Sequence, residues 1–222
     1  MFSRNDNGLS SRLTALLAAG AIASAFTLSS ASAAHADDLE RTSDDVVAAI
    51  EGQPWPQYTN GDDNVDIQAA QMLLAYHGFD SGEFSPAFGD ELEEQVLAFQ
   101  SVPANDLVET GELDEETWLL LRERTFGEFG PGSSGIVVEM IQVLLNAKFD
   151  SGLDVDGLYG EATEAAVEEA QDFFGIGVDG IFGPLTFRAV VHLQPDDGAN
   201  GDDEEAADTG APAEGQDDLR LY

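Results

Sequence analysis

The chain has 222 residues and a formal net charge of −36, because 44 Asp and Glu residues stand against eight Lys and Arg residues. Such acidity excludes nucleic-acid binding through phosphate neutralisation and predicts repulsion from anionic membranes. No cysteine is present, which excludes disulfides, thiol peptidases and lipid attachment through cysteine. Because salt screens like charges, the acidity points to a salt-adapted source, although a solvated acidic surface would account for it equally well.

Residues 1–36 have the pattern of a secretory signal peptide. Arg4 and Arg12 precede an apolar, Ala-rich run over residues 13–28, and Ala34-His35-Ala36 fits an A-x-A cleavage site. The run is too short and wrongly flanked for a membrane span, and the alternative interpretation is a buried N-terminal helix. We therefore expect the mature protein to be exported and free of covalent lipid.

Residues 37–52 form an acidic lead-in, and one apolar run within it predicts a single short helix. Two copies of one unit follow, over residues 53–125 and 126–194. Matching residues lie 71 positions apart, and 69 apart near the end of each copy. The matched pairs are Gln71 with Gln142, Gly89 with Gly160, Val96 with Val167, Gln100 with Gln171, Gly111 with Gly180 and Thr117 with Thr186. A repeat of this period indicates two copies of one small domain.

Each copy has the apolar spacing of three short helices. In the second copy, the i, i+3, i+4 and i+7 positions of one helix face are Val137, Met140, Ile141 and Leu144. A second helix follows from Glu161 and a third from Pro184, whose missing N–H suits a first helical position. We predict an all-α fold with two tandem small three-helix domains. Residues 195–222 lack the apolar residues that would offset ordering, so we predict a disordered acidic C-terminal tail there.

One loop motif occurs twice in the second copy, as Asp156-Gly-Leu-Tyr-Gly-Glu-Ala-Thr163 and as Asp179-Gly-Ile-Phe-Gly-Pro-Leu-Thr186, 23 residues later. The pattern is typical of a turn that leads into a helix: Asp braces the turn, and the next Gly supplies a positive φ. The aromatic residue fills the core and the second Gly caps the helix. In this interpretation the motif is structural. Two such loops side by side would also make a groove edged by amides, carboxylates and an aromatic ring.

These motifs, together with a preceding Leu-Gln-x-x-Leu-like helix, resemble the peptidoglycan-binding domain of bacterial cell-wall proteins. The resemblance covers both copies and is most specific in the second. It implies a compact three-helix module, often found in tandem and often joined to wall hydrolases. The first copy departs from the pattern. There Ser85-Pro-Ala-Phe-Gly89 replaces Asp-Gly-x-Phe-Gly, and Leu92 stands where Thr is expected. Its core positions persist, so its fold should survive, but whether it binds is left open.

The resemblance implies a secreted, non-catalytic protein that binds peptidoglycan, by glycan or stem peptide, and is associated with the cell wall. No cofactor is implied. The candidate binding residues are Asp156, Gly157, Tyr159, Gln171, Asp179, Phe182 and Arg188. The two aromatic rings could stack on a ligand or belong to the core. Arg188 could pair with a ligand carboxylate or neutralise a nearby Glu.

Catalysis finds little support in the residues. Only His77 and His192 follow the signal segment, in unrelated contexts, whereas a catalytic zinc site needs about three protein ligands. No G-x-S-x-G motif occurs. Residues 150–161 carry Val155 where a calcium-binding EF-hand loop needs Gly, so no metal site is expected. Two alternatives remain, namely an accessory or inhibitory partner of a wall hydrolase and a carboxylate-dependent lytic enzyme.

Overall fold

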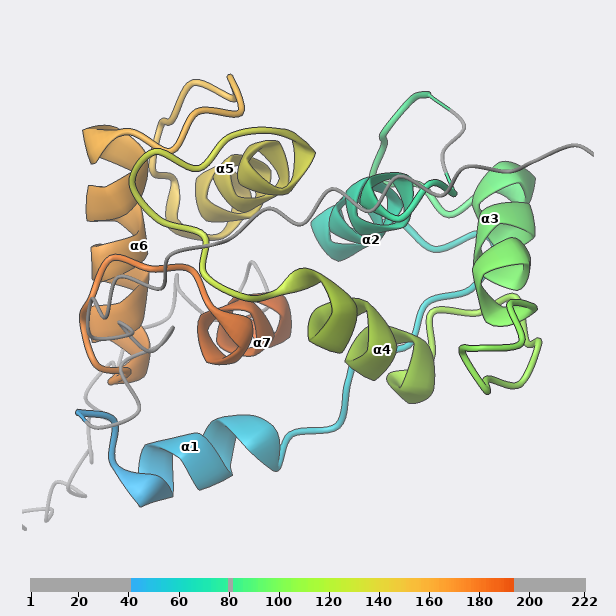
Figure 1. The fold of residues 1–222 in the computed structure, drawn as a ribbon, viewed down its shortest axis with the longest axis horizontal. Helices are drawn as coiled ribbons and strands as arrows, with labels where there is room; N and C mark the ends of the chain where they lie inside the picture. The colour runs from blue at the N-terminus through green and yellow to red at the C-terminus, as the bar shows by residue number, and fades with distance from the viewer. Residues whose placement is uncertain (1–40, 80–81, 194–222) are drawn as a thin grey trace, which may run out of the picture. The chain divides into compact units, whose positions relative to one another are not determined.

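The computed structural model of the chain describes residues 41–79 and 82–193 (Figure 1). These residues form seven helices, with isolated β-bridges in place of strands. The helices are α1 (Asp44–Glu51), α2 (Val65–Tyr76), α3 (Asp90–Gln100), α4 (Glu115–Thr125), α5 (Ile136–Phe149), α6 (Glu161–Phe174) and α7 (Pro184–His192). Helices α2 to α4 make the first repeat and α5 to α7 the second, so the predicted all-α chain of two three-helix repeats is confirmed. The predicted signal peptide, residues 1–36, and the predicted tail, residues 195–222, lie outside the described residues.

Local sequence explains where the helices begin. The side chain of Asn64 accepts a hydrogen bond from the backbone N–H of Asp66, and Asp114 does the same for Thr117. Both bonds satisfy amides that have no partner inside a helix. Pro184 occupies the first turn of α7, as its sequence context predicts.

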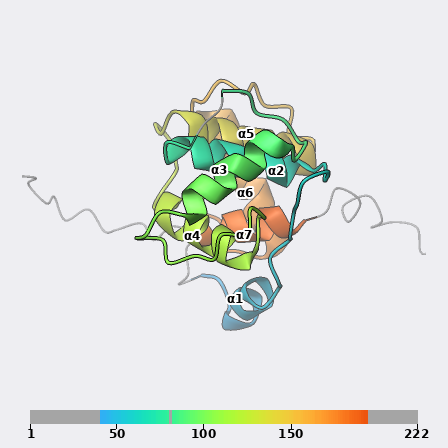
Figure 2. The same cartoon turned by 90° about the vertical axis from the view of Figure 1, so that its right-hand side faces the viewer.

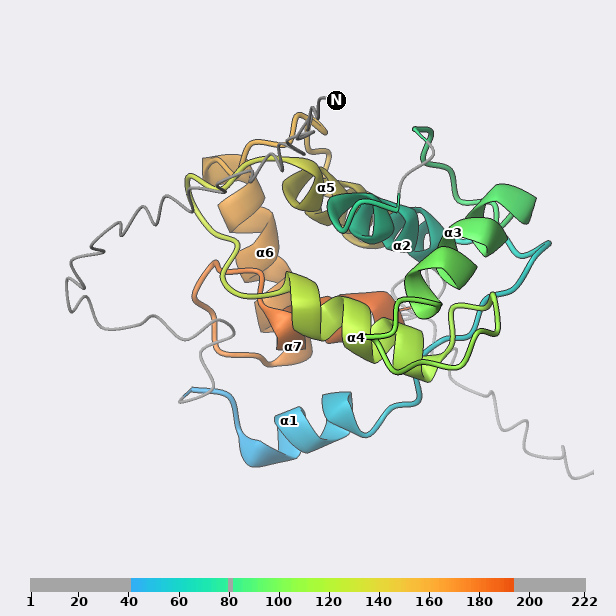
Figure 3. The ribbon, with the colours of Figure 1, turned by 45° about the vertical axis from the view of Figure 1, so that its right-hand side comes forward.

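The two repeats share one hydrophobic core. Helices α2 and α5, the first helix of each repeat, lie side by side in Figures 1 and 3 and make the most extensive helix–helix contact among the described residues. A single cluster of buried side chains runs from the first repeat, with Leu73 and Trp118, to the second, with Met140 and Phe187. The domain boundaries predicted at residues 53, 126 and 194 therefore stay a prediction, since no break in packing separates the copies.

An ion pair inside this core joins the repeats. Lys148 Nζ of α5 lies 2.7 Å from Asp66 Oδ1 of α2, and neither side chain is exposed to solvent. The ammonium also donates to the carbonyl oxygens of Val191, at 3.1 Å, and Leu193, at 2.7 Å. The hydroxyl of Tyr58 donates to the second oxygen of Asp66 at 2.9 Å. Burial raises the pKa of the Asp66 carboxyl, while Lys148 and Tyr58 act in the opposite direction.

Helix α1, the predicted helix of the lead-in, packs on the last helix of the second repeat. It lies beyond α7 when seen from α5, as Figures 1 and 2 both show. Ile50 of α1 is buried against Ile176, Leu185 and Ala189. The lead-in helix is thus part of the fold. It packs on the second repeat, although the chain continues from it directly into α2 of the first repeat.

Candidate functional site

Buried glutamines hold the loops that precede the helices. Gln142 of α5 accepts two hydrogen bonds at Oε1, from the backbone N–H groups of Asp156 at 3.0 Å and Gly157 at 2.9 Å. Its Nε2 donates to Asp156 Oδ1, the Leu158 carbonyl and Thr163 Oγ1, at 2.9, 3.2 and 3.3 Å. One amide side chain therefore makes five hydrogen bonds to a single loop, which it fixes against α5.

Gln171 of α6 repeats this arrangement at the second loop. Its Oε1 accepts from the N–H groups of Asp179 and Gly180, both at 3.0 Å. Its Nε2 donates to Asp179 Oδ1, the Ile181 carbonyl and Thr186 Oγ1, at 2.7, 3.0 and 3.5 Å. The predicted positive φ of the motif glycine is confirmed, with +67° at Gly180.

The first repeat has one glutamine of the same kind. Gln100 of α3 accepts from the N–H groups of Thr110 and Gly111, both at 2.9 Å. It donates to Thr110 Oγ1, the Glu112 carbonyl and Thr117 Oγ1, at 3.0, 3.1 and 2.9 Å. Thr110 stands in the place of the motif Asp and still provides an acceptor, so the loop keeps its form although the sequence has changed.

Most of the predicted binding residues serve this framework. Gln171 and Phe182 are fully buried, and Tyr159 is almost so. The Tyr159 hydroxyl donates to the Gly180 carbonyl at 2.8 Å, so this ring links one loop to the next. These three side chains present no surface to a ligand. That Tyr159, Gln171 and Phe182 contact peptidoglycan stays a prediction, and the contacts described here are structural ones.

The polar loop residues are more accessible. Asp156 is exposed, and hydrogen bonds from Gln142 and from the Leu158 N–H lower the pKa of its carboxyl. Gly157 forms the turn with a φ of +68°, and a Cβ there would come within 2.9 Å of a Glu139 side-chain oxygen. Asp179 is half-buried. The loops thus present carboxylates at fixed positions.

Arg188 lies inside the protein. Its guanidinium donates to the carbonyl oxygens of Ile50 and Glu51, both at 2.9 Å, and to that of Gln53. Its Cζ sits 4.6 Å from the centre of the Trp55 ring, and its Nε lies 3.5 Å from the Glu51 carboxylate. Of the two roles predicted for Arg188, the structure shows the pairing with a nearby Glu.

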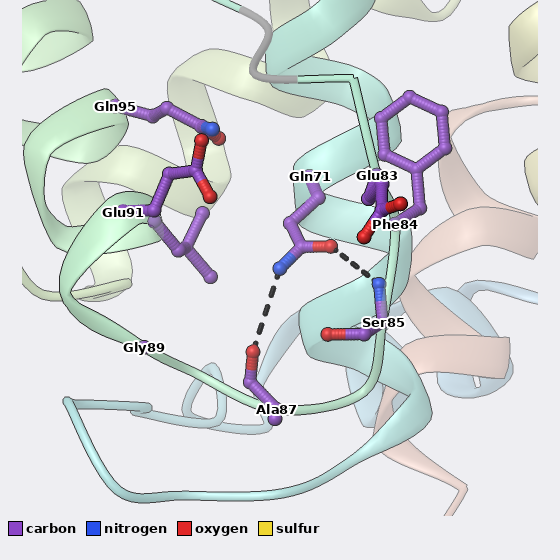
Figure 4. A pocket seen from close by; sticks show the side chains of 9 residues that line it. Gln71, Glu83, Phe84, Ser85, Ala87, Gly89, Glu91 and Gln95 are labelled. Carbon is purple, nitrogen blue, oxygen red and sulfur yellow. Dashed lines mark hydrogen bonds between the residues drawn. The ribbon is translucent and has the colours of Figure 1, made fainter.

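The fourth glutamine of the series is incompletely bonded. Among the described residues, Gln71 of α2 accepts at Oε1 only from the Ser85 N–H, at 2.8 Å, because Pro86 has no N–H to offer. Within the same residues its Nε2 donates only to the Ala87 carbonyl, at 3.5 Å (Figure 4). Leu92 stands where Thr163 accepts a bond in the second repeat. A pocket of about 450 Å³ lies beside the glutamine.

The pocket has a polar and an apolar part. Figure 4 shows Glu91 and Gln95 of α3 on one side and Glu83 and Phe84 on the other, with Gln71 between them. Sequence reasoning noted that residues 85–92 depart from the motif but did not predict a pocket. The signal that could have found it is the match of Gln71 to Gln142 without matching partners in the loop.

His77 and His192 each lie within hydrogen-bonding distance of another protein group. The Nε2 of His77 lies 2.9 Å from Thr125 Oγ1, and the Nε2 of His192 lies 2.9 Å from the Pro54 carbonyl. Across residues 41–79 and 82–193, no three His, Asp or Glu side chains are placed to hold a metal ion. Within the same residues, no helix has the length and apolar character needed to cross a bilayer.

Comparison with known protein families finds one family model that matches both repeats. The family model described as "Putative peptidoglycan binding domain" matches residues 63–121 and 134–190, together more than half of the chain. The first match includes the loop that departs from the motif, so the altered loop belongs to a recognisable copy. No curated protein matches the chain. With both three-helix repeats matched in tandem, the chain belongs to this peptidoglycan-binding domain family.

Proposed function

We propose that the chain is an exported, non-catalytic protein that attaches to the peptidoglycan of a cell wall. The observation that carries the proposal is the tandem match of both repeats to a binding-domain family. Export rests on the signal-like pattern of residues 1–36. The absence of a catalytic role is proposed because the two repeats and α1 account for all seven helices of the described residues.

The loops after α5 and α6 supply the second-repeat contact surface in this proposal. The hydrogen bonds of Gln142 and Gln171 fix the backbones of these loops before a ligand binds. The loss of conformational entropy on binding is therefore smaller. Asp156 and Asp179 offer carboxylate oxygens to hydroxyl or amide donors, and Leu158 adds an apolar side chain that is 59% exposed. Tyr159, Gln171 and Phe182 act from beneath by holding the loops in place.

Long-range attraction does not assist this binding. The chain carries a charge of −36, and wall polymers are commonly anionic as well. Salt screens the repulsion between them, so retention on wall material should hold or increase as the ionic strength rises. A collapse of retention between low and moderate salt would show that cationic contacts dominate and would contradict the proposed mechanism.

The direct test is sedimentation of the pure full chain with purified, polymer-stripped sacculi over a range of salt. Binding that saturates supports the proposal. A chain that stays in the supernatant at every ionic strength refutes it. Following the turbidity of the same suspension tests the non-catalytic part, because clearing that one Asp or Glu substitution abolishes would identify a lytic enzyme instead.

A further inference from the structure

The glutamine series singles out one site. Gln100, Gln142 and Gln171 each donate from Nε2 to three acceptors and accept at Oε1 from two amides. Gln71 makes one long donor bond and one acceptor bond, although its side chain is only 7% exposed. A buried amide N–H without a good acceptor is costly, since the group has lost its water. The pocket beside it is where a ligand acceptor would supply the missing bond.

The charges around the pocket restrict what can enter. Glu83 and Glu91 are exposed at its rim, and none of the described residues that line the pocket is a Lys, Arg or His. An anionic group such as a phosphate or a free carboxylate would therefore be repelled. A cation with hydrogen-bond donors would be attracted, because charge-assisted bonds to carboxylates are the strong ones.

The apolar part of the pocket adds a second restriction. Phe84 and Ala87 provide a face for an aliphatic chain, with Leu92 buried beneath, and the ring of Phe84 also suits a cation placed over it. Gly89 leaves the pocket open, because a Cβ built there would meet nothing within 4 Å. An alkyl chain that ends in an ammonium group combines both requirements.

We propose that the pocket beside Gln71 binds a peptide with a primary alkylammonium side chain, as the diamino acid of a peptidoglycan stem peptide provides. The ammonium lies between Glu83 and Glu91, the alkyl chain lies along Phe84 and Ala87, and a peptide carbonyl accepts from Gln71 Nε2. This inference rests on the proposed function and adds to it the stem peptide as the part recognised by the first repeat. The first loop differs from the other three in that its glutamine makes fewer hydrogen bonds to it.

Titration of the full chain with a soluble stem tripeptide that carries a free side-chain amine and amidated carboxyl groups tests the proposal. Binding is followed by calorimetry and by backbone amide shifts in NMR spectra. The double variant Glu83→Gln/Glu91→Gln should weaken binding by roughly tenfold or more, as expected for the loss of charge-assisted bonds. The double variant Glu94→Gln/Glu109→Gln removes the same number of charges at two exposed positions outside the pocket lining and should leave binding unchanged.

A pocket-filling variant gives an independent test. Gly89→Leu places a side chain in the pocket, and Gly160→Leu is its matched control, since both glycines precede a helix with extended backbone and open space at Cβ. Gly89→Leu should lower the affinity by about tenfold or more, and Gly160→Leu should not, although both carry a similar capping cost.

Peptide titration tests the inference, and sedimentation with sacculi tests the proposed function, so the two can fail separately. The same peptide with its side-chain amine acetylated should bind at least about tenfold more weakly, and equal binding overturns the inference. Shifts around Gln71 caused by glycan fragments instead of the peptide also overturn it. If sacculi retain the chain while the free peptide does not bind, the inference falls and the proposed function stands. If sacculi do not retain the chain, the proposed function falls as well.

Discussion

Replacing Lys148 with methionine tests whether the buried ion pair holds the two repeats together. The substitution keeps an unbranched side chain of similar length and removes the charge. It leaves the carboxylate of Asp66 without its cation and fully buried, with Tyr58 as its remaining donor. Breaking a buried pair from one side costs about 3–5 kcal/mol, which is a large part of the roughly 5–15 kcal/mol that stabilises a typical domain.

The effect should depend on pH in a defined direction. Burial already raises the pKa of Asp66 above its ordinary 3.8, and removal of Lys148 raises it further. A raised carboxyl pKa means that the folded state binds the proton more tightly, so stability is greatest below the unfolded pKa. It then decreases as the pH rises through the window up to the folded pKa, by at most about 1.36 kcal/mol per pH unit. The deficit of the variant should therefore be smallest near pH 4, close to the ordinary pKa of the carboxyl, and should grow as the pH rises.

The assay is urea unfolding followed by the fluorescence of Trp55 and Trp118, whose rings stack at 5.8 Å inside the shared core. The double variant Lys148→Met/Asp66→Asn removes both charges and should recover much of the loss, since a buried pair replaced by neutral groups is often close to neutral in stability. A single-variant cost under about 1 kcal/mol, or a double variant as unstable as the sum of the singles, would refute the reasoning.

Three further predictions concern side chains outside that pair. Gln142→Leu removes five hydrogen bonds and should lower the free energy of unfolding by about 3 kcal/mol or more, measured by urea titration. Gln71→Leu removes two hydrogen bonds and should lower the free energy of unfolding by only about 1 kcal/mol in the same assay. Equal losses for Gln71→Leu and Gln142→Leu would contradict the weaker bonding of Gln71. Burial alone would raise the pKa of Glu51, but Arg122 and two neighbouring cations lower it below its ordinary 4.5. The contribution of Glu51 to α1 docking is therefore present above about pH 4.5 and is lost as the pH falls through the lower folded pKa. Glu51→Gln should remove this dependence from amide exchange in α1, and an unchanged pH profile would count against it.

Local features of the fold could be predicted from the sequence because they depend on neighbouring residues. The interpretation of residues 156–163 as a turn that leads into a helix is confirmed by the positive φ of Gly157 and by the buried ring of Tyr159. Apolar spacing likewise located the helices. These signals are local, since a turn glycine and a helix face are specified within a few residues.

Contacts between the copies could not be predicted in the same way. The packing of α2 on α5 has no signature in the sequence. Apolar spacing shows which face of a helix is buried, but it does not show which other helix packs on that face. One signal was available and was missed. Lys148 is the only lysine of the chain, and an isolated cation in the last turn of a helix, on its apolar face, indicates a buried partner.

The candidate site was predicted only in part. Sequence reasoning selected Phe182 from the motif and Gln171 and Arg188 as polar side chains able to bond a ligand, but the sequence does not say whether these side chains point toward solvent. Arg188 reaches the carbonyl oxygens of residues 50–53, far away along the chain, and such a contact requires the tertiary structure. The pocket lies beside Gln71, which lacks bonds that Gln100, Gln142 and Gln171 make to their loops. This difference is visible only when the four glutamines are compared in the structure.

The shared core of α2 and α5 limits the ways in which the two repeats could bind peptidoglycan at the same time. Tandem modules on a flexible linker gain avidity over a wide range of target spacings. Here the two repeats share one hydrophobic core, so a chain that used both repeats to bind the wall would need neighbouring strands at a matching separation and tilt. We expect such a protein to bind ordered wall layers through both repeats and loosened layers through a single repeat.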